Sequence, residues 1–228
     1  TPRGVRRLAN NVYGAAVRLL ALSLTVLIVL AAAGVGMDLV AWQCSAQEVQ
    51  CVEARTLSTH LPSPGSLLSG PSLLLLVGAV LPTTVILVLW RLSRRTAADY
   101  EVVGHASARG SADDAAPLSR PDFWGNSETM ARLRSTHVAV AVATVAALLL
   151  MPALSFDLAA HRVGEPVLPG SRTPGVVLAV LLAVVATAGT LSVLVPGVDP
   201  RWNARADRFC ALLRNLSLGL VPAVVVYA

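Results

Sequence analysis

Residues 137–156, HVAVAVATVAALLLMPALSF, decide the fold of this chain. The stretch contains no Asp, Glu, Lys or Arg, and as an α-helix it would extend about 30 Å. That length matches the hydrocarbon thickness of a bilayer, so the stretch predicts a transmembrane helix. Arg132 and Arg134 precede it, a weakly charged segment follows it, and other apolar runs repeat this layout along the chain.

The composition of the whole chain also predicts a membrane location. Of its 228 residues, 55% are apolar and 14% are charged, whereas soluble domains average about 25% charged residues. A water-soluble fold of this composition would expose large apolar patches. We therefore predict one integral membrane domain over residues 1–228. It is an all-α, multi-pass transmembrane helical bundle with four full spans and a fifth that is truncated or marginal. The spans are expected at about residues 15–36, 72–90, 137–156, 175–195 and, in part, 209–228.

The first apolar run has a competing interpretation as a cleaved signal peptide, because it follows a basic start. The run is longer than the usual apolar region of a signal peptide, which has about 7–15 residues. We expect it to be retained as the first span. At the other end, the chain stops within an apolar stretch, and we expect the protein to continue beyond Ala228.

The distribution of arginine predicts the orientation of the spans. The amino-terminal segment and the second and fourth connections contain fifteen of the eighteen basic residues, all of them arginine. The positive-inside rule places these segments, and the amino terminus, in the cytoplasm. The absence of lysine and the excess of Arg, Ala, Val and Leu are typical of GC-rich bacterial coding, so we expect the inner (plasma) membrane. The net charge of +5 suggests nucleic acid, but these arginines flank spans, and no nucleic-acid partner is expected.

The connections carry two further predictions. Residues 96–122 are rich in small and polar residues and are expected to form a flexible cytoplasmic loop. Cys44 and Cys51 lie in the first outer loop, where an oxidising compartment would favour a disulfide between them. Two independent reduced thiols are the alternative.

Small residues recur at helical spacing on two spans and predict how those spans pack. Close backbone approach at small side chains holds helices together in lipid. We expect the two series to face each other or a shared third helix: Ala139, Ala143 and Ala146 on the third span, and Ala179, Ala183, Ala186 and Thr190 on the fourth.

The sharpest candidate for chemistry is Asp157, His161 and Glu165, which are spaced four residues apart. On a helix they would share one face just outside the membrane, where carboxylate and imidazole groups suit a divalent metal. A solvated face is the alternative, and Pro166 ends the helix near Glu165. No catalytic motif occurs, and neither catalytic residues nor a cofactor are predicted.

Three functions remain open from the sequence alone. The first is a membrane-anchoring or scaffolding module of a larger protein, with the bilayer, other membrane helices or a fused domain as partners. The second is a subunit or fragment of a transporter or channel. The third is a membrane enzyme with an outward-facing site near Asp157, His161 and Glu165. A non-enzymatic role is favoured because the interiors of the second, third and fourth spans contain no ionisable residue.

Overall fold

The computed structural model describes residues 2–43, 71–107, 127–163, 172–194 and 200–227, and these residues are helical. The elements are α1 (Pro2–Ala33), the π-helix η1 (Gly34–Gln43) that continues it, α4 (Pro71–Ser107), α6 (Ser127–Val163), α7 (Arg172–Leu194) and α8 (Pro200–Tyr227). Five helices in the described ranges are long and apolar enough to cross a membrane: Asn11–Asp38, Leu75–Arg95, Met130–Ala159, Thr173–Leu194 and Arg205–Tyr227. The predicted helical bundle is confirmed.

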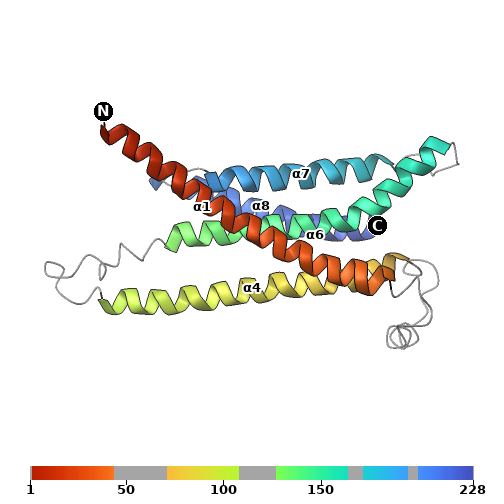
Figure 1. Ribbon diagram of the computed structural model, residues 1–228, viewed down its shortest axis with the longest axis horizontal. Helices are drawn as coiled ribbons and strands as arrows, with labels where there is room; N and C mark the ends of the chain where they lie inside the picture. The colour runs from red at the N-terminus through yellow and green to blue at the C-terminus, as the bar shows by residue number, and fades with distance from the viewer. Residues whose placement is uncertain (1, 44–70, 108–126, 164–171, 195–199, 228) are drawn as a thin grey trace.

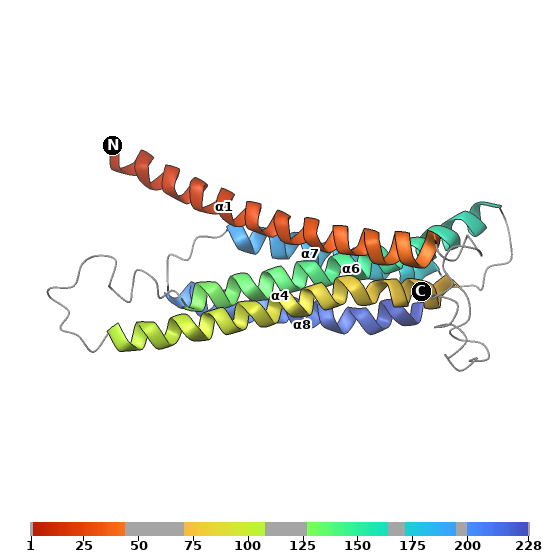
Figure 2. The same ribbon diagram turned by 60° about the horizontal axis from the view of Figure 1, so that its bottom comes forward.

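The helices alternate in direction. Helices α1, α6 and α8 begin at one end of the bundle, and α4 and α7 finish at that end (Figures 1 and 2). We call it the arginine end, because the arginines at residues 3, 6, 7, 91, 94, 95, 132, 134, 205 and 208 flank the spans there. At this end the first part of α1 diverges from the other helices, and Val5, Leu8 and Tyr13 are exposed.

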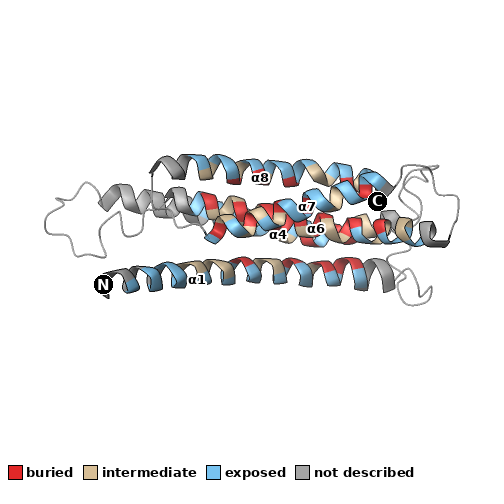
Figure 3. Ribbon diagram, turned by 90° about the horizontal axis from the view of Figure 1, so that it is seen from above, coloured by how far each residue is buried: buried red, intermediate tan, exposed pale blue. Residues whose placement is uncertain are grey.

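Helix α6, which contains the stretch 137–156, is the centre of the bundle. It packs against α1, α4, α7 and α8. Within the most apolar part of each span, 56% of α6 is buried inside the molecule, compared with 22–28% for the others. Figure 3 shows the difference: many residues of α6 are buried, whereas on the outer helices the buried residues form narrow stripes. The run of alanine and valine lets four neighbours approach one helix closely.

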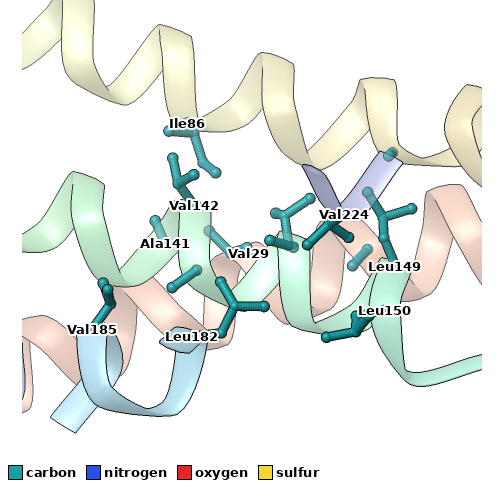
Figure 4. Close-up of a cluster of buried hydrophobic side chains, with 14 of the residues drawn as sticks. Val29, Ile86, Ala141, Val142, Leu149, Leu150, Leu182, Val185 and Val224 are labelled. Atoms are coloured by element: carbon teal, nitrogen blue, oxygen red, sulfur yellow. The ribbon is translucent and has the colours of Figure 1, made fainter. Parts of the chain in front are cut away.

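One apolar cluster joins all five helices. Helix α6 contributes Leu149 and Leu150 together with its buried alanines and valines. The four other helices each add side chains to the same cluster, among them Val29, Ile86, Leu182, Val185 and Val224 (Figure 4). The middle of the bundle is thus filled by apolar side chains at the depth of the hydrocarbon core.

The outward faces of the helices are apolar as well. Large apolar side chains are exposed along their length, including Leu20, Leu24 and Leu27 of α1, Val80 and Leu87 of α4, Val180 and Val184 of α7, and Leu212, Leu216 and Val226 of α8. Such a continuous apolar exterior is suited to contact with lipid chains and not with water. The chain is a helical membrane protein.

Helix α4 crosses η1 at a pair of glycines. A Cβ atom at Gly78 would lie 2.6 Å from the carbonyl oxygen of Gly36 and 2.8 Å from Cα of Met37. A Cβ at Gly36 would in turn collide with the carbonyl oxygen of Gly78. That carbonyl is the one to which Pro82, four residues later, cannot donate a hydrogen bond. Two residues without side chains therefore let the backbones touch at this crossing.

The fifth span extends further than the sequence predicts. It covers Arg205–Tyr227, 23 residues, whereas the uninterrupted apolar stretch begins only after Arg214. The span reaches this length because α8 begins at Pro200 and includes Arg205, Arg208 and Arg214. Long arginine side chains extend along apolar surface to place their charge outside the hydrocarbon core.

The predicted loop at 96–122 is wrong for its first part. Helix α4 continues to Ser107, so residues 96–107 are helical. This stretch, TAADYEVVGHAS, contains alanine and glutamate, which favour helix, and has no proline. Residues 108–122 lie outside the described part of the chain.

The predicted packing of the small-residue series is correct for α6 and wrong for part of α7. Ala139, Ala143 and Ala146 are buried, at 2% exposure or less. Ala183 is exposed, whereas Ala179, Ala186 and Thr190 are half-buried. The buried face of α7 is instead made by Gly175, Leu182, Val185, Gly189 and Val193. Because the α6 alanines are small, larger side chains of α7 fill the space beside them.

Candidate functional site

Polar contacts between helices gather near the two ends of α6. At the arginine end, Nε of Arg132 donates a hydrogen bond to Oδ1 of Asp207 on α8 at 3.0 Å, and the pair forms a salt bridge. Arg132 is 9% exposed and Asp207 is 38% exposed. The carboxylate lies toward the surface and the guanidinium lies inside, so this ion pair fixes α6 against α8.

One turn further along α6, Thr136 connects three helices. Its hydroxyl is buried and lies 3.3 Å from Oγ of Ser192 on α7 and 3.5 Å from Sγ of Cys210 on α8. The same hydroxyl also contacts the carbonyl oxygen of Arg132 at 3.1 Å. A hydroxyl has one proton and two lone pairs, so it can serve several neighbours.

The next residue, His137, joins α6 to α1. Its Nδ1 atom lies 2.8 Å from Oγ1 of Thr25 in a hydrogen bond whose donor depends on the imidazole tautomer. Since Thr25 also contacts the carbonyl oxygen of Ala21 at 3.1 Å, its hydroxyl bridges its own helix and α6. We use the name polar network for Thr25, Arg132, Thr136, His137, Ser192, Asp207 and Cys210.

At the opposite end of α6, Asp157 pairs with the last described residue of α8. The phenol of Tyr227 donates a hydrogen bond to Oδ2 of Asp157. Gly175, at the start of α7, lies directly against the Tyr227 ring, and a Cβ there would collide with the phenol oxygen. This contact brings α6, α7 and α8 together at the end far from the arginines.

The two sets of contacts are about one bilayer apart. Thr136 and Asp157 are separated by twenty-one residues, or about 31 Å of α-helix. Between them α6 is lined by alanine, valine and leucine, and the hydroxyl of Thr144 bonds to its own helix at the carbonyl of Val140. The geometry is that of a five-helix unit whose central helix is joined to its neighbours by hydrogen bonds near both of its ends.

The predicted metal site is only partly described. Asp157 lies on α6 as expected, with its carboxylate engaged by Tyr227. His161 lies in the last turn of the helix, but its side chain and Glu165 are outside the described part. Within that part, no three His, Cys, Asp or Glu side chains gather in a metal-binding group. The metal site stays a prediction, as does the Cys44–Cys51 disulfide, which also lies outside the described residues.

The contacts between helices at the two ends of α6 were not predicted from the sequence. Arg132 and Asp207 are 75 positions apart, and Asp157 and Tyr227 are 70 apart. Each residue alone resembles an ordinary juxtamembrane side chain. One feature of the sequence could have indicated these contacts. Thr136 and His137 lie at the start of the apolar stretch, where polar groups on neighbouring spans lie at a similar depth and can form hydrogen bonds.

No protein-family model, no curated protein and no solved structure matches this chain. Its function is therefore argued from its own residues.

The contact between Tyr227 and Asp157 has a measurable effect on stability. Tyr227→Phe removes the hydrogen bond and keeps the ring against Gly175, so the free energy of unfolding should fall by about 1 kcal/mol. Tyr13→Phe is the matched control, because Tyr13 is 74% exposed, and it should cost nothing measurable. Unfolding curves in mixed micelles compare the two. Equal curves would mean that the hydrogen bond does not stabilise the bundle.

The ion pair at the arginine end gives a second stability test. Asp207→Asn keeps the shape of the side chain but removes the charge facing the buried guanidinium of Arg132. Because Asp207 is partly exposed and screened by solvent, the loss should be about 1–2 kcal/mol. Arg208→Gln, at an exposed neighbour on α8, should lie within about 0.5 kcal/mol of the parent protein. A larger effect at Arg208 than at Asp207 would contradict the assignment.

Proposed function

We propose that this chain is a membrane scaffold: a rigid helical unit that anchors another protein, or another part of its own chain, at the bilayer. The observation that carries the proposal is the construction of α6. Four helices pack on it, its middle is filled by apolar side chains, and polar contacts fix it at both ends. Such a bundle holds its ends at constant positions, which is the requirement for presenting a partner.

The polar side chains of the described bundle support this role. Two acidic side chains hold helices to one another, because the carboxylates of Asp157 and Asp207 each bond to a neighbouring helix. The hydroxyls of Thr83, Thr144 and Thr190 bond to carbonyls of their own helix. Groups engaged in this way stabilise an assembly.

Photocrosslinking in native membranes tests the scaffold. A crosslinking amino acid placed at Met130 or Arg205, both exposed at the arginine end, should give adducts with one and the same protein. At Val180, on the outward face of α7, it should give lipid adducts only. Cells without the chain should release the captured protein from the membrane fraction.

Two results would contradict the proposal. Protein adducts absent from both arginine-end positions would remove the scaffold role. Solute flux through liposomes that contain only this chain would support the transporter alternative, especially if substitution of the polar network changed the flux.

We propose further that the arginine end faces the cytoplasm. Ten described arginines flank the spans at this end, whereas Arg162 and Arg172 lie at the other end, and arginine is retained on the cytoplasmic side during insertion. A cysteine at Ser107, in an otherwise cysteine-free chain, should resist a membrane-impermeant reagent added to sealed cells. A cysteine near Gly170 should react. Strong labelling at Ser107 would reverse the orientation.

A further inference from the structure

A cationic surface lies on α4 at the arginine end. Arg91, Arg94 and Arg95 are all exposed and fall within about 6 Å along the helix axis. From Pro71 to Ala98, α4 carries these three arginines and no acidic residue. We call the three the α4 cationic surface.

The side chains that the structure describes place no carboxylate in an ion pair with these arginines, and the acidic residues of α4 itself, Asp99 and Glu101, come after Ala98. The ion pair found among the described side chains joins Arg132 to Asp207, which belong to α6 and α8. None of the three α4 arginines has a described carboxylate within ion-pair distance. An exposed group of like charges attracts a partner of opposite charge.

Neighbouring side chains help to position this surface. The guanidinium of Arg94 stacks over the ring of Trp90, 5.4 Å from its centroid. From α6, Nε of Arg134 donates a hydrogen bond to Oγ of Ser93 at 3.1 Å, which holds a fourth guanidinium beside α4. Tryptophan and arginine together are typical of the depth of lipid head groups.

Toward the middle of the span, next to these arginines, the same face of α4 is apolar. Leu87 lies one turn before Arg91, and Val88 lies next to it; they are 48% and 49% exposed. Residues three or four apart share one side of a helix. The face therefore offers positive charge at head-group depth and an apolar surface just inside the membrane.

We propose that the α4 cationic surface binds the phosphate of an anionic phospholipid, whose acyl chains lie along Leu87 and Val88. Charge complementarity accounts for the head group, and the continuous apolar face accounts for the chains. A free phosphate would use only the first of these features. The proposal is independent of the scaffold role, because it concerns lipid and not a protein partner.

Lipid titration followed by native mass spectrometry tests this site. The purified chain is titrated with phosphatidylglycerol and with phosphatidylcholine of the same acyl chains. Each arginine near a membrane surface contributes about fivefold in affinity for anionic lipid. Three such contributions multiply to about a hundredfold, so the triple variant Arg91→Gln, Arg94→Gln, Arg95→Gln should lose between about tenfold and a hundredfold of its affinity for phosphatidylglycerol. Its weak binding of phosphatidylcholine should stay unchanged.

The matched control removes the same number of charges from two other helices, α1 and α8. Arg18→Gln, Arg205→Gln, Arg208→Gln leaves α4 intact and should keep most of the preference for phosphatidylglycerol. Equal losses of affinity for phosphatidylglycerol in the two triple variants would overturn the proposal, since binding would then depend on total charge and not on the α4 cationic surface. It would also fail if soluble glycerol 3-phosphate bound as tightly as phosphatidylglycerol, because the apolar face would then have no part in binding.

Discussion

Gly78→Ala is expected to destabilise the protein by about 2–3 kcal/mol, although the same change usually stabilises a helix. The added methyl group would lie 2.6 Å from the carbonyl oxygen of Gly36 and 2.8 Å from Cα of Met37. Both atoms belong to the backbone, so neither can move away by changing rotamer. Relief requires α4 to separate from η1, which opens the cluster that includes Met37 and Ala79.

Gly219→Ala provides a control of opposite sign. Gly219 lies within α8, and a Cβ there would meet nothing within 4 Å. Alanine should stabilise that helix by up to about 1 kcal/mol. Reversible unfolding in mixed micelles measures both variants. If both shift the free energy of unfolding in the same direction, the glycine crossing is not a close backbone contact.

Ala146→Leu should have the second large effect, a loss of about 2–3 kcal/mol. Ala146 is 0% exposed at the centre of α6, where it belongs to the cluster shared with Leu182 and Val185. A leucine there must push a neighbouring helix outward. Lipid cannot compensate, because an acyl chain is as apolar as the displaced side chains.

Ala183→Leu is the informative comparison for this variant. Pattern alone places Ala183 in a packed series, but it is exposed on α7. The substitution should therefore change stability by no more than about 0.5 kcal/mol. The unfolding midpoints of Ala146→Leu and Ala183→Leu are compared in the same assay, and the midpoint of Ala146→Leu should be the lower one. A larger loss for Ala183→Leu would mean that α7 turns its alanine series inward.

The existence, number and approximate bounds of the helices could be predicted from hydropathy. The stretch 137–156 lies wholly within α6, and Thr173–Leu194 matches the predicted fourth span closely. This works because a span must satisfy its backbone internally and present apolar side chains along its whole length. Both requirements can be seen in the amino-acid composition of the span itself, independently of the helices that pack against it.

The rotation of α7 and the polar network could not be predicted in the same way. Alanines at helical spacing show that one face of a helix carries small side chains. Such a face can pack against either small or large side chains of a neighbouring helix. In this bundle the small face of α6 meets Leu182 and Val185. Likewise, nothing in one sequence links Asp157 to Tyr227, 70 residues later.

The polar contacts that join α6 to its neighbours at both ends also determine how the protein responds to bilayer thickness. Helices joined at Arg132, Thr136 and Asp157 cannot slide past one another to shorten the bundle. In a membrane thinner than about 30 Å, α6, α7 and α8 must therefore tilt together, or the surrounding lipid must stretch to match them. In a thicker membrane the lipid must compress instead. The cost of this mismatch, a fraction of a kcal/mol for each ångström, would favour membrane regions whose hydrocarbon depth matches the spacing between the two fastened ends.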